Sequence, residues 1–529
     1  MTNLTPEQRA LGRENANRAI GVTRRDWLKA AAAAPAVGAF YFGYGRMDGK
    51  SAVKAAIIGT GNEGCQAMIR DHNREYLDFI GFCDIRPSQQ ERARKEFAAH
   101  KDYGPEAAKK ITQYADAKAM LADPEVEVVV IALPLWLHAP IAIDAMKAGK
   151  HVFCEKLMAH SVAECKEMCR VARETNKLLA IGHQRHYSVL YDNANFLVNE
   201  GHLGEIRHIR ALWHRNNAQP RVAKGSDGKP IYDPKTGDPV YVRDENGQIV
   251  YVDSWKPDIP ELDKSVDFAK YGYKSLDELV RWRLYNRTGA GLMAELGSHQ
   301  LDACSIFLGK KHPLSVSGVG GTFFYKDGRE VDDHVFVTFE FPGGEYRLGA
   351  DPKRDSGERV VVTYSSINTN AFENYGEMLM GSRGTMIVEG EKEILLYKEG
   401  GGSLGARTTS VTVEKNASGK PLVEASPSQT GPSAASSLGG LATADPSRGY
   451  REELEHFAYC IRHGNASNYH DDPDHKPRCR GEVALADAVI ALTSNLAMKQ
   501  RRRIEFDERW FDFNSPETPE AAVALAKKV

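Results

Sequence analysis

Short apolar runs alternate with amphipathic segments through the first third of the chain. The apolar runs have the length of buried strands and are Val53–Ile58, Phe79–Cys83, Val126–Leu133, His151–Cys154 and Lys177–Gly182. Helical patterns lie between them at Gly64–Asn73, Gln89–Ala99, Ala115–Ala122, Ala139–Ala148 and Val162–Thr175. Alternating strands and helices favour a parallel, doubly wound sheet. The sequence therefore predicts an α/β domain over residues 51–180.

Beyond this region the pattern becomes rich in strands. The β-type runs are Glu205–Arg215, Leu314–Tyr325, Asp332–Phe341, Arg359–Ile367, Thr385–Gly390 and Lys392–Lys398, and a helical pattern at Gly291–Leu308 interrupts them. Turn signals at Pro342-Gly343-Gly344 and Gly390-Glu391 join neighbouring runs as hairpins. Residues 181–447 are therefore predicted to form a second α/β domain with a large, mainly antiparallel open sheet, for substrate binding and oligomerisation.

Two segments of this second region have the composition of insertions. Residues 219–260 carry Asp-Gly, Thr-Gly and Asn-Gly turns between short Tyr/Val runs, which predicts surface hairpins. Residues 400–447 are dominated by Gly, Ala, Ser, Thr and Pro, which predicts a mobile loop. Residues 448–529 are expected to hold the helices Arg448–His463 and Gly481–Lys499, a short strand near Arg503–Phe506 and a polar tail.

The N-terminal region contains a pair of arginines before an uncharged segment. Arg24 and Arg25 lie within Thr23–Lys29, and the uncharged stretch Ala30–Gly45 follows. This order predicts a twin-arginine export signal over residues 1–50, outside the fold, and a periplasmic or exported bacterial protein. The stretch is short for a bilayer span, which needs about 20 apolar residues. An uncleaved membrane tether and a plain amphipathic helix stay open as alternatives.

Composition limits the classes of partner and cofactor. The 529 residues carry a formal net charge of −2 with acids and bases interspersed, so no nucleic-acid-binding surface is indicated. The eight cysteines form no C-x-x-C pair and are expected to be mostly buried thiols. The loop His470–His475 is rich in His and Asp, but adjacent residues rarely converge on one ion, and no metal is predicted.

A glycine-rich turn follows the first strand directly. Its residues are Gly59, Thr60, Gly61, Asn62, Glu63 and Gly64. The first glycine permits the sharp turn, the second lets a pyrophosphate approach the backbone, and the third lets the helix pack closely on the strand. Asp84 ends the next strand, where a carboxylate would bind the ribose hydroxyls of NAD, although Arg86 nearby leaves the choice between NAD and NADP open. We predict a Rossmann-type nucleotide site.

Two further positions carry candidate chemistry. Lys156 follows the strand His151–Cys154, at the sheet edge where ligands of doubly wound sheets lie, although a surface Glu-Lys pair is the alternative. Glu295, His299 and Asp302 are spaced i, i+4 and i+7 and share one helix face. Glu295 would orient the imidazole of His299 as a proton acceptor. A core histidine or a metal-binding face are the alternatives.

These features together resemble the Gfo/Idh/MocA oxidoreductases, named after glucose–fructose oxidoreductase and inositol dehydrogenase. The resemblance covers about residues 52–400 and the C-terminal helices. It rests on the glycine turn, Leu133–His138, Gly149–Lys156, and Gly289-Ala290-Gly291 leading to Glu295 and His299. Leu157 and Glu295 depart from the family's usual proline and aspartate, so the substrate subclass stays open.

The resemblance implies a Rossmann domain joined to an α/β domain whose open sheet often mediates oligomers. It implies that Lys156 acts on the substrate and touches the nicotinamide, with His299 as proton acceptor. The cofactor site would include Leu133, Pro134, His138, Glu155 and Lys156. A sugar substrate would contact Arg185, Tyr187 and Asp302. The first two lie in a segment that lines the interdomain cleft in this family, and a packing role is an equal alternative for both.

The leading hypothesis is an exported NAD-dependent oxidoreductase acting on a carbohydrate or polyol hydroxyl, with tightly bound NAD and a homo-oligomeric state. The catalytic residues would be Lys156, His299 and Glu295. The second hypothesis is an NAD-dependent glycoside hydrolase that works by transient oxidation and elimination. The third is a non-catalytic nucleotide or sugar sensor, against which the presence of Lys156 and His299 argues.

Overall fold

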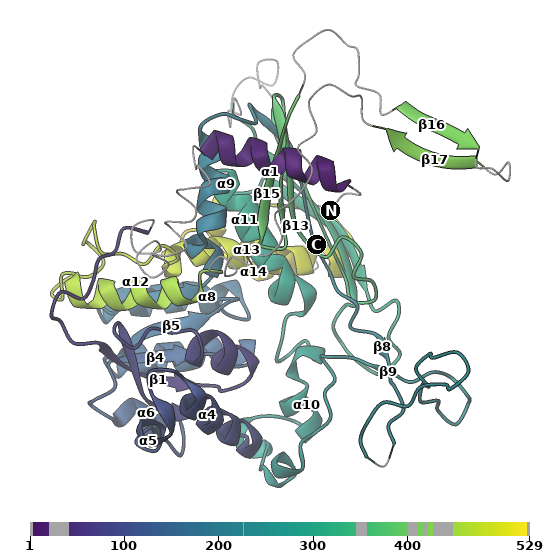
Figure 1. The fold of residues 1–529 in the computed structure, drawn as a ribbon. Helices are drawn as coiled ribbons and strands as arrows, with labels where there is room; N and C mark the ends of the chain where they lie inside the picture. The colour runs from purple at the N-terminus through teal and green to yellow at the C-terminus, as the bar shows by residue number, and fades with distance from the viewer. Residues whose placement is uncertain are drawn as a thin grey trace.

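The computed structural model describes residues 4–20, 42–225, 227–344, 357–399, 410–415, 421–426 and 448–525. Two β-sheets form the body of the molecule, one above the other in Figure 1, and helices pack against both. The cysteines are all free and buried, as predicted.

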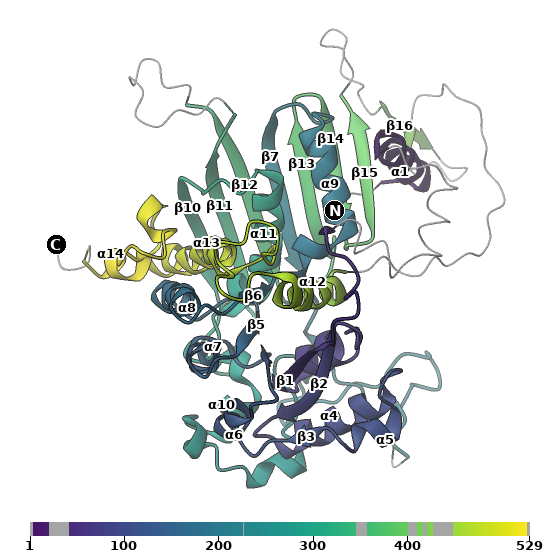
Figure 2. The same ribbon diagram turned by 90° about the vertical axis from the view of Figure 1, so that its left-hand side faces the viewer.

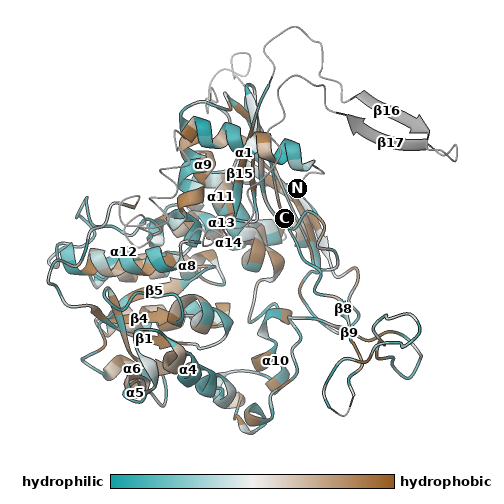
Figure 3. Ribbon diagram, viewed as in Figure 1, coloured by the Kyte–Doolittle hydropathy of each residue, from teal (hydrophilic) through white to brown (hydrophobic). Residues whose placement is uncertain are grey.

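The lower sheet is the predicted parallel one. Its strand order is β3-β2-β1-β4-β5-β6 and all of its neighbours pair in parallel. The strands are β1 (Val53–Ile58), β2 (Leu77–Cys83), β3 (Thr112–Gln113), β4 (Val128–Ile131), β5 (His151–Glu155) and β6 (Leu179–Gly182). Every residue of β4 and β5 is buried, and the strands of this sheet are largely hydrophobic (Figure 3). The doubly wound domain is confirmed, although the two-residue edge strand β3 and the short helix at Gly104–Ala108 were not predicted.

Helices cover both faces of this sheet, as the connections between parallel strands require. They are the π-helical turn Gly64–Ile69, α4 (Pro87–Ala99), α5 (Gly104–Ala108), α6 (Ala117–Ala122), α7 (His138–Lys147) and α8 (Val162–Glu174). Ser161 caps α8: its hydroxyl accepts from the Glu164 backbone N–H, and the Glu164 carboxylate accepts from the Ser161 N–H. Such a reciprocal cap fixes the start of a helix.

The upper sheet has eight strands in the order β15-β14-β13-β7-β12-β11-β10-β18. They are β7 (Ile206–His214), β10 (Ser315–Gly321), β11 (His334–Pro342), β12 (Arg359–Ile367), β13 (Tyr375–Gly381), β14 (Gly384–Glu389), β15 (Glu393–Lys398) and β18 (Ile504–Glu505). Only β7 and β12 pair in parallel, so the prediction of a mainly antiparallel sheet is confirmed. The strand β13 was missed because its glycines interrupt the apolar pattern.

One face of the upper sheet is covered by helices (Figure 2). These are α9 (Val189–Asn199), α11 (Ser298–Phe307) and α13 (Gly481–Gln500), and α14 (Pro519–Leu525) packs against α13. The helix α12 (Tyr450–His463) instead contacts β1, β2 and β6 of the lower sheet, so the C-terminal region contributes to both layers. By length and composition α13 could cross a membrane, but 72% of its apolar window is buried inside the protein, which is typical of a core helix.

The first predicted insertion forms hairpins beside the main body. The short strands β8 (Gln219–Pro220) and β9 (Tyr251–Val252) pair, and further bridges such as Val222 with Tyr241 lie between them, as predicted. In the second insertion, β16 (Ser410–Lys415) and β17 (Pro421–Ser426) pair as a hairpin that projects from the upper sheet (Figure 1). The expectation of a loop is wrong for these two strands, and the rest of 400–447 lies outside the described residues.

The N-terminal region is part of the fold at both of its described ends. The helix α1 (Pro6–Ile20) packs against the edge strand β15, and Arg9 forms ion pairs with Glu389 of β14 and Glu393 of β15 at 2.6 and 2.8 Å. Phe42, Tyr44 and Met47 are buried in the core below α12. The expectation that residues 1–50 lie outside the fold is therefore wrong for these segments, because an exposed sheet edge is stabilised by a covering helix. Residues 21–41, which carry the arginine pair, lie outside the described residues.

Candidate active site

A cavity of about 1210 Å³ lies at the carboxyl ends of the lower sheet's strands and extends to the upper sheet. Its lower wall comes from the segments that follow β1, β2, β4 and β5. Between β1 and β4 the strand order reverses, and this is the point at which doubly wound sheets bind their ligands. Its upper wall comes from β7, the turn Met293–Gly297 and α11.

The glycine turn has the geometry that a dinucleotide needs. Gly59 has φ 90°, and a Cβ there would lie 2.3 Å from the carbonyl oxygen of Ala132. A Cβ on Gly64 would lie 2.1 Å from the carbonyl oxygen of Gly59, so this glycine permits close packing of helix and strand. A Cβ on Gly61 would meet no atom within 4 Å, because it faces the cavity. The three glycines therefore hold the places predicted for them, and the loop fits a pyrophosphate.

Asp84 lines the cavity at the adenosine end of the predicted cofactor site. Its Oδ2 accepts from the Thr60 N–H at 2.8 Å, and its Oδ1 accepts from the Arg86 N–H at 2.9 Å. Burial raises the pKa of Asp84, and these hydrogen bonds oppose that rise. Thr60 itself is fully buried and is absent from the cavity wall. We therefore assign it the role of positioning the Asp84 carboxylate, in place of the predicted contact with the cofactor.

The side chain of Arg86 is held by an acid from the second domain. Its Nε donates to Oδ2 of Asp263 at 2.9 Å, and Ser88 donates to the same carboxylate through its N–H and its hydroxyl. Asp263 lies in the 3-10 turn Glu261–Ser265 and is fully buried. The charge of Arg86, which left the choice of cofactor open, is therefore paired within the protein.

The remaining predicted cofactor residues fall into two groups. Leu133, Pro134, Asn62 and Glu63 line the cavity. His138 also lines the cavity, but both nitrogens of its ring have partners in the protein: Nδ1 lies 2.8 Å from the carbonyl oxygen of Leu157, and Nε2 lies 2.9 Å from that of Leu133. We therefore revise its role to positioning the loops that follow β4 and β5.

Glu155 lines the cavity at the end of β5. Burial and the nearby charge of Glu63 raise the pKa of Glu155, so its carboxyl group holds a proton more readily than a surface carboxylate. Its Oε2 accepts from the Lys156 N–H at 3.2 Å. Glu155 thus helps to fix the backbone from which Lys156 extends.

Lys156 and His299 line the same cavity. Nζ of Lys156 donates to the backbone carbonyl of Glu295 at 2.9 Å, one turn before His299. The His299 ring lies 5.4 Å, centroid to centroid, from that of Trp213. Burial lowers the pKa of His299 well below its ordinary value, and the charge of Lys156 adds to this effect. The imidazole is therefore neutral at neutral pH and is able to accept a proton.

Glu295 does not orient His299, contrary to the prediction. Its Oε2 accepts from Nε of Arg283 at 2.8 Å, whereas Nδ1 of His299 is buried with no hydrogen-bond partner among the described residues. Burial raises the pKa of Glu295, but the charges of Arg283 and Lys156 outweigh it and lower the pKa overall. A fixed positive charge attracts the carboxylate more strongly than a neutral imidazole does, and the spacing in sequence does not reveal Arg283.

Arg185 and Tyr187, which were predicted to contact a sugar, are buried away from the cavity. Arg185 forms ion pairs with Glu377 at 3.0 Å and Glu391 at 3.2 Å, and it also donates to the backbone carbonyl of His299. The Tyr187 hydroxyl accepts from the Arg478 N–H at 2.7 Å. The packing alternative holds for both, because buried polar groups require such partners.

Asp302, the third predicted substrate residue, belongs to a separate buried cluster. Its Oδ1 lies 2.9 Å from Nε2 of His186 and 2.6 Å from Nζ of Lys310. Burial opposes its ionisation, but the charges of His186 and Lys310 hold the pKa of Asp302 well below its usual value. The prediction of a sugar contact is therefore wrong for Asp302.

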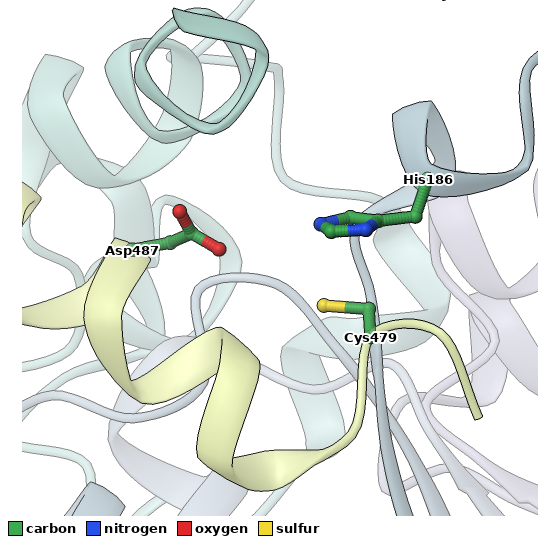
Figure 4. A group of neighbouring side chains, drawn as sticks. All are labelled: His186, Cys479 and Asp487. Atoms are coloured by element: carbon green, nitrogen blue, oxygen red, sulfur yellow. The ribbon is translucent and has the colours of Figure 1, made fainter. Parts of the chain in front are cut away.

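The same cluster has the composition of a metal site. Figure 4 shows the side chains of His186, Cys479 and Asp487 directed toward one shared space. Nζ of Lys310 lies 3.4 Å from the Asp487 carboxylate as well, so an ammonium already supplies the positive charge between the two aspartates. We assign this cluster a structural role. In the described chain, no residue of the loop His470–His475 belongs to a metal-type group.

Sequence reasoning missed most of the cavity's upper wall. Aromatic and cationic side chains provide it, namely Trp213, Arg215, Trp255, Tyr271, Tyr273, Trp282, Arg283, Arg448, Tyr450 and Arg451. The end of the predicted strand Glu205–Arg215 was the one available signal, since residues at strand ends frequently face ligands. The residues from 253 to 283 lie in loops and in helices of at most five residues, such as α10 (Leu276–Val280), which are too short to show a periodic pattern.

Two regions of the chain match models of known domain families. Residues 53–183 match "Oxidoreductase family, NAD-binding Rossmann fold", and residues 266–349 match "GFO/IDH/MocA C-terminal domain". Inositol 2-dehydrogenase of Salmonella typhimurium is 29% identical over 170 residues, which is 32% of this chain and 48% of that protein. The chain thus spans about half the length of the curated relatives it matches.

Solved structures share the fold across most of the chain. WlbA dehydrogenase from Bordetella pertussis, in complex with NADH and UDP-GlcNAcA, has a TM-score of 0.55 at 14% identity, with 87% of this chain and 98% of that chain covered. Levoglucosan dehydrogenase, in complex with NADH and levoglucosan, has a TM-score of 0.53 at 16% identity, with 87% and 100% covered. Residues 53–183 and 266–349 are therefore similar to the NAD-binding Rossmann domain and the C-terminal domain of the Gfo/Idh/MocA oxidoreductases.

Proposed function

We propose that this protein is an NAD(H)-dependent oxidoreductase that acts on a CH–OH group of a sugar or polyol. The observation that carries the proposal is the meeting of Lys156 and His299 in the cavity that also contains the glycine turn. An amine and a neutral imidazole beside a dinucleotide site are the groups that alcohol oxidation requires.

Each of the two residues has a distinct part in this proposal. Lys156, held by the carbonyl of Glu295, binds the reacting hydroxyl and keeps it oriented. His299 accepts the hydroxyl proton, since burial keeps its imidazole neutral. Glu295 and Arg283 form an ion pair beside these two residues, so that the charges of the carboxylate and the guanidinium offset each other. Bound NAD supplies the hydride acceptor.

The aromatic upper wall supports a carbohydrate-sized substrate. Trp213 stacks on Tyr375 with ring centroids 4.6 Å apart and an interplanar angle of 18°, so its orientation is fixed before a ligand binds. Trp255, Trp282 and Tyr273 line the same cavity. Aromatic faces pack against the apolar C–H faces of sugar rings. The names of the similar proteins, an inositol 2-dehydrogenase and a levoglucosan dehydrogenase, agree with this substrate class.

Turnover assays test the proposal. Purified protein is incubated with NAD and a panel of aldoses, uronates, inositols and glycosides, with NADH absorbance and product mass as readouts. We expect a keto or lactone product and stoichiometric NADH. Absence of turnover across the panel by protein that binds NAD would contradict the proposal. Release of an aglycone without net NADH would instead indicate the glycoside hydrolase that works by transient oxidation.

Export and a retained cofactor are part of the same proposal. Their support is the arginine pair Arg24-Arg25, since a twin-arginine substrate folds, and binds its nucleotide, before transport. The packing of α1 against β15 supports the proposal of an uncleaved tether. Mass spectrometry of native protein from cell fractions measures the N-terminus, the compartment and any bound nucleotide. Cytoplasmic protein free of nucleotide would contradict both points.

A homo-oligomer is proposed from the face of the upper sheet that the described helices leave exposed. Val319 and Phe336 are paired across β10 and β11 and are 62% and 45% exposed. Exposed apolar side chains that cluster on a flat sheet commonly mark an interface. Light scattering of wild type and Phe336→Glu tests this surface: we expect a dimer or larger assembly that dissociates in the variant, and a monomeric wild type would refute it.

A further inference from the structure

We propose that Arg215 binds a carboxylate of the substrate, so that the natural substrate is an acidic sugar such as a hexuronate. The inference rests on the proposed oxidoreductase function and names the substrate class of the same cavity. It is carried by the position of Arg215 and by the pairing of every other arginine in the cavity wall.

Arg215 lies at the end of β7, where the chain enters the upper wall of the cavity. Its backbone N–H donates to the carbonyl of Ile367 at 2.8 Å, which anchors the residue to β12. Its guanidinium carbon lies 4.9 Å from the ring centroid of Trp213, so the side chain extends along the indole. The residue is half-buried and lines the cavity.

The other arginines of the cavity wall are neutralised by acids within the protein. Their ion pairs are Arg70–Glu96, Arg86–Asp263, Arg283–Glu295, Arg448–Glu391 and Arg451–Glu455. Arg215 forms no ion pair and no side-chain hydrogen bond with any residue that the structure describes. A desolvated guanidinium without a counter-ion is costly, and an anionic ligand group would offset that cost.

The position of Arg215 suits a substituent on the ring that reacts. The His299 ring lies 5.4 Å from the ring of Trp213, and the Arg215 guanidinium lies 4.9 Å from that same ring. Both groups therefore border one indole, and a single sugar ring over this surface can reach both of them. The carboxylate and the reacting hydroxyl would then belong to the same monosaccharide.

The chemistry of the side chain favours a carboxylate over a neutral hydroxyl. A guanidinium presents paired N–H donors in a plane, which matches the two oxygens of a carboxylate. Burial lowers the pKa of Arg215, while arginine stays charged in proteins. The charge of Glu295 raises the pKa of Arg215, but the carboxylate of Glu295 is hydrogen-bonded to Arg283. An acid sugar thus supplies the partner that the protein does not.

Calorimetry and kinetics on the NAD-loaded protein test the assignment. The ligands are glucuronate and galacturonate, the matching neutral aldoses, and glucose 6-phosphate as a second anion. We expect wild type to bind a uronate at least tenfold more tightly than its aldose. Arg215→Gln should remove that preference and lower kcat/KM for the uronate ten- to hundredfold. Arg215→Lys should restore part of it, since the charge remains without the planar fork.

Two controls make the result decisive. Arg221→Gln removes an exposed arginine outside the cavity wall and should change neither binding nor turnover. NAD affinity and thermal stability should match wild type in every variant. A wild type that binds aldoses as tightly as uronates, or an Arg215→Gln protein that keeps the uronate preference, would overturn the inference. Preferred binding of glucose 6-phosphate would overturn the carboxylate assignment. Uronate binding without turnover of any sugar would count against the oxidoreductase proposal alone.

Discussion

Gly61→Ala should separate cofactor binding from folding in this protein. A Cβ on Gly61 would meet no protein atom within 4 Å, and the residue does not adopt a positive φ. Alanine is therefore compatible with the backbone, and a compatible Gly→Ala change stabilises a fold by about 0.4–1 kcal/mol. The new methyl group would point into the cavity, where the pyrophosphate of NAD has to approach the turn.

The magnitude of the binding defect follows from this geometry. Insertion of a methyl group into a close contact costs about 1–3 kcal/mol. That cost corresponds to a rise in the Kd for NAD of roughly five- to 150-fold. Calorimetric titration with NAD measures the affinity, and thermal unfolding without ligand measures the stability. We expect a weakened NAD complex together with an unchanged or slightly raised Tm.

Gly64→Ala is the matched control. Its Cβ would lie 2.1 Å from the carbonyl oxygen of Gly59, which is backbone and cannot move away cheaply. This variant should lose stability by about 1–3 kcal/mol or more before any ligand is added. If Gly61→Ala bound NAD as tightly as wild type at an unchanged Tm, the pyrophosphate would lie elsewhere and our placement of the cofactor would be refuted.

Three further results are expected. Lys156→Met should lower kcat by about 10²–10⁴-fold, because the amine acts on the substrate hydroxyl, and should change the Kd for NAD little. Near-normal turnover by this variant would exclude that role of Lys156. Asp263→Asn removes the acid that pairs with Arg86 and should raise NADP affinity about tenfold in titrations, whereas Asp263→Asn combined with Arg86→Gln should not. The free energy of unfolding should fall as the pH is lowered from about 6.5 toward 3, because histidines bind protons in the unfolded chain but stay neutral when buried with pKa values of about 3. Denaturant titrations should show a loss of about 1.4 kcal/mol per pH unit for each such histidine. A free energy of unfolding that does not change with pH in this window would refute the assignment. These histidines are His72, His151, His183 and His456.

Local patterns in the sequence determined the lower sheet and the cofactor turn. The period of apolar residues located strands such as Val53–Ile58, and Gly59 and Gly64 occupy the tight places expected of them. These features depend on backbone geometry within a few residues, so they are visible in a linear pattern. The placement of Lys156 at the end of β5 follows from the same reasoning, because every parallel strand ends at one edge of the sheet.

Tertiary structure alone decided which charges pair with which. Glu295 lies four residues from His299, yet its carboxylate binds Arg283, and Arg185 binds Glu377 and Glu391 rather than a ligand. The burial of α1 on β15 likewise depends on a sheet edge far away in sequence. Ion pairs and packing contacts are set by distance in space and by the dielectric environment around each group, and neither quantity is encoded in the spacing of residues along the chain.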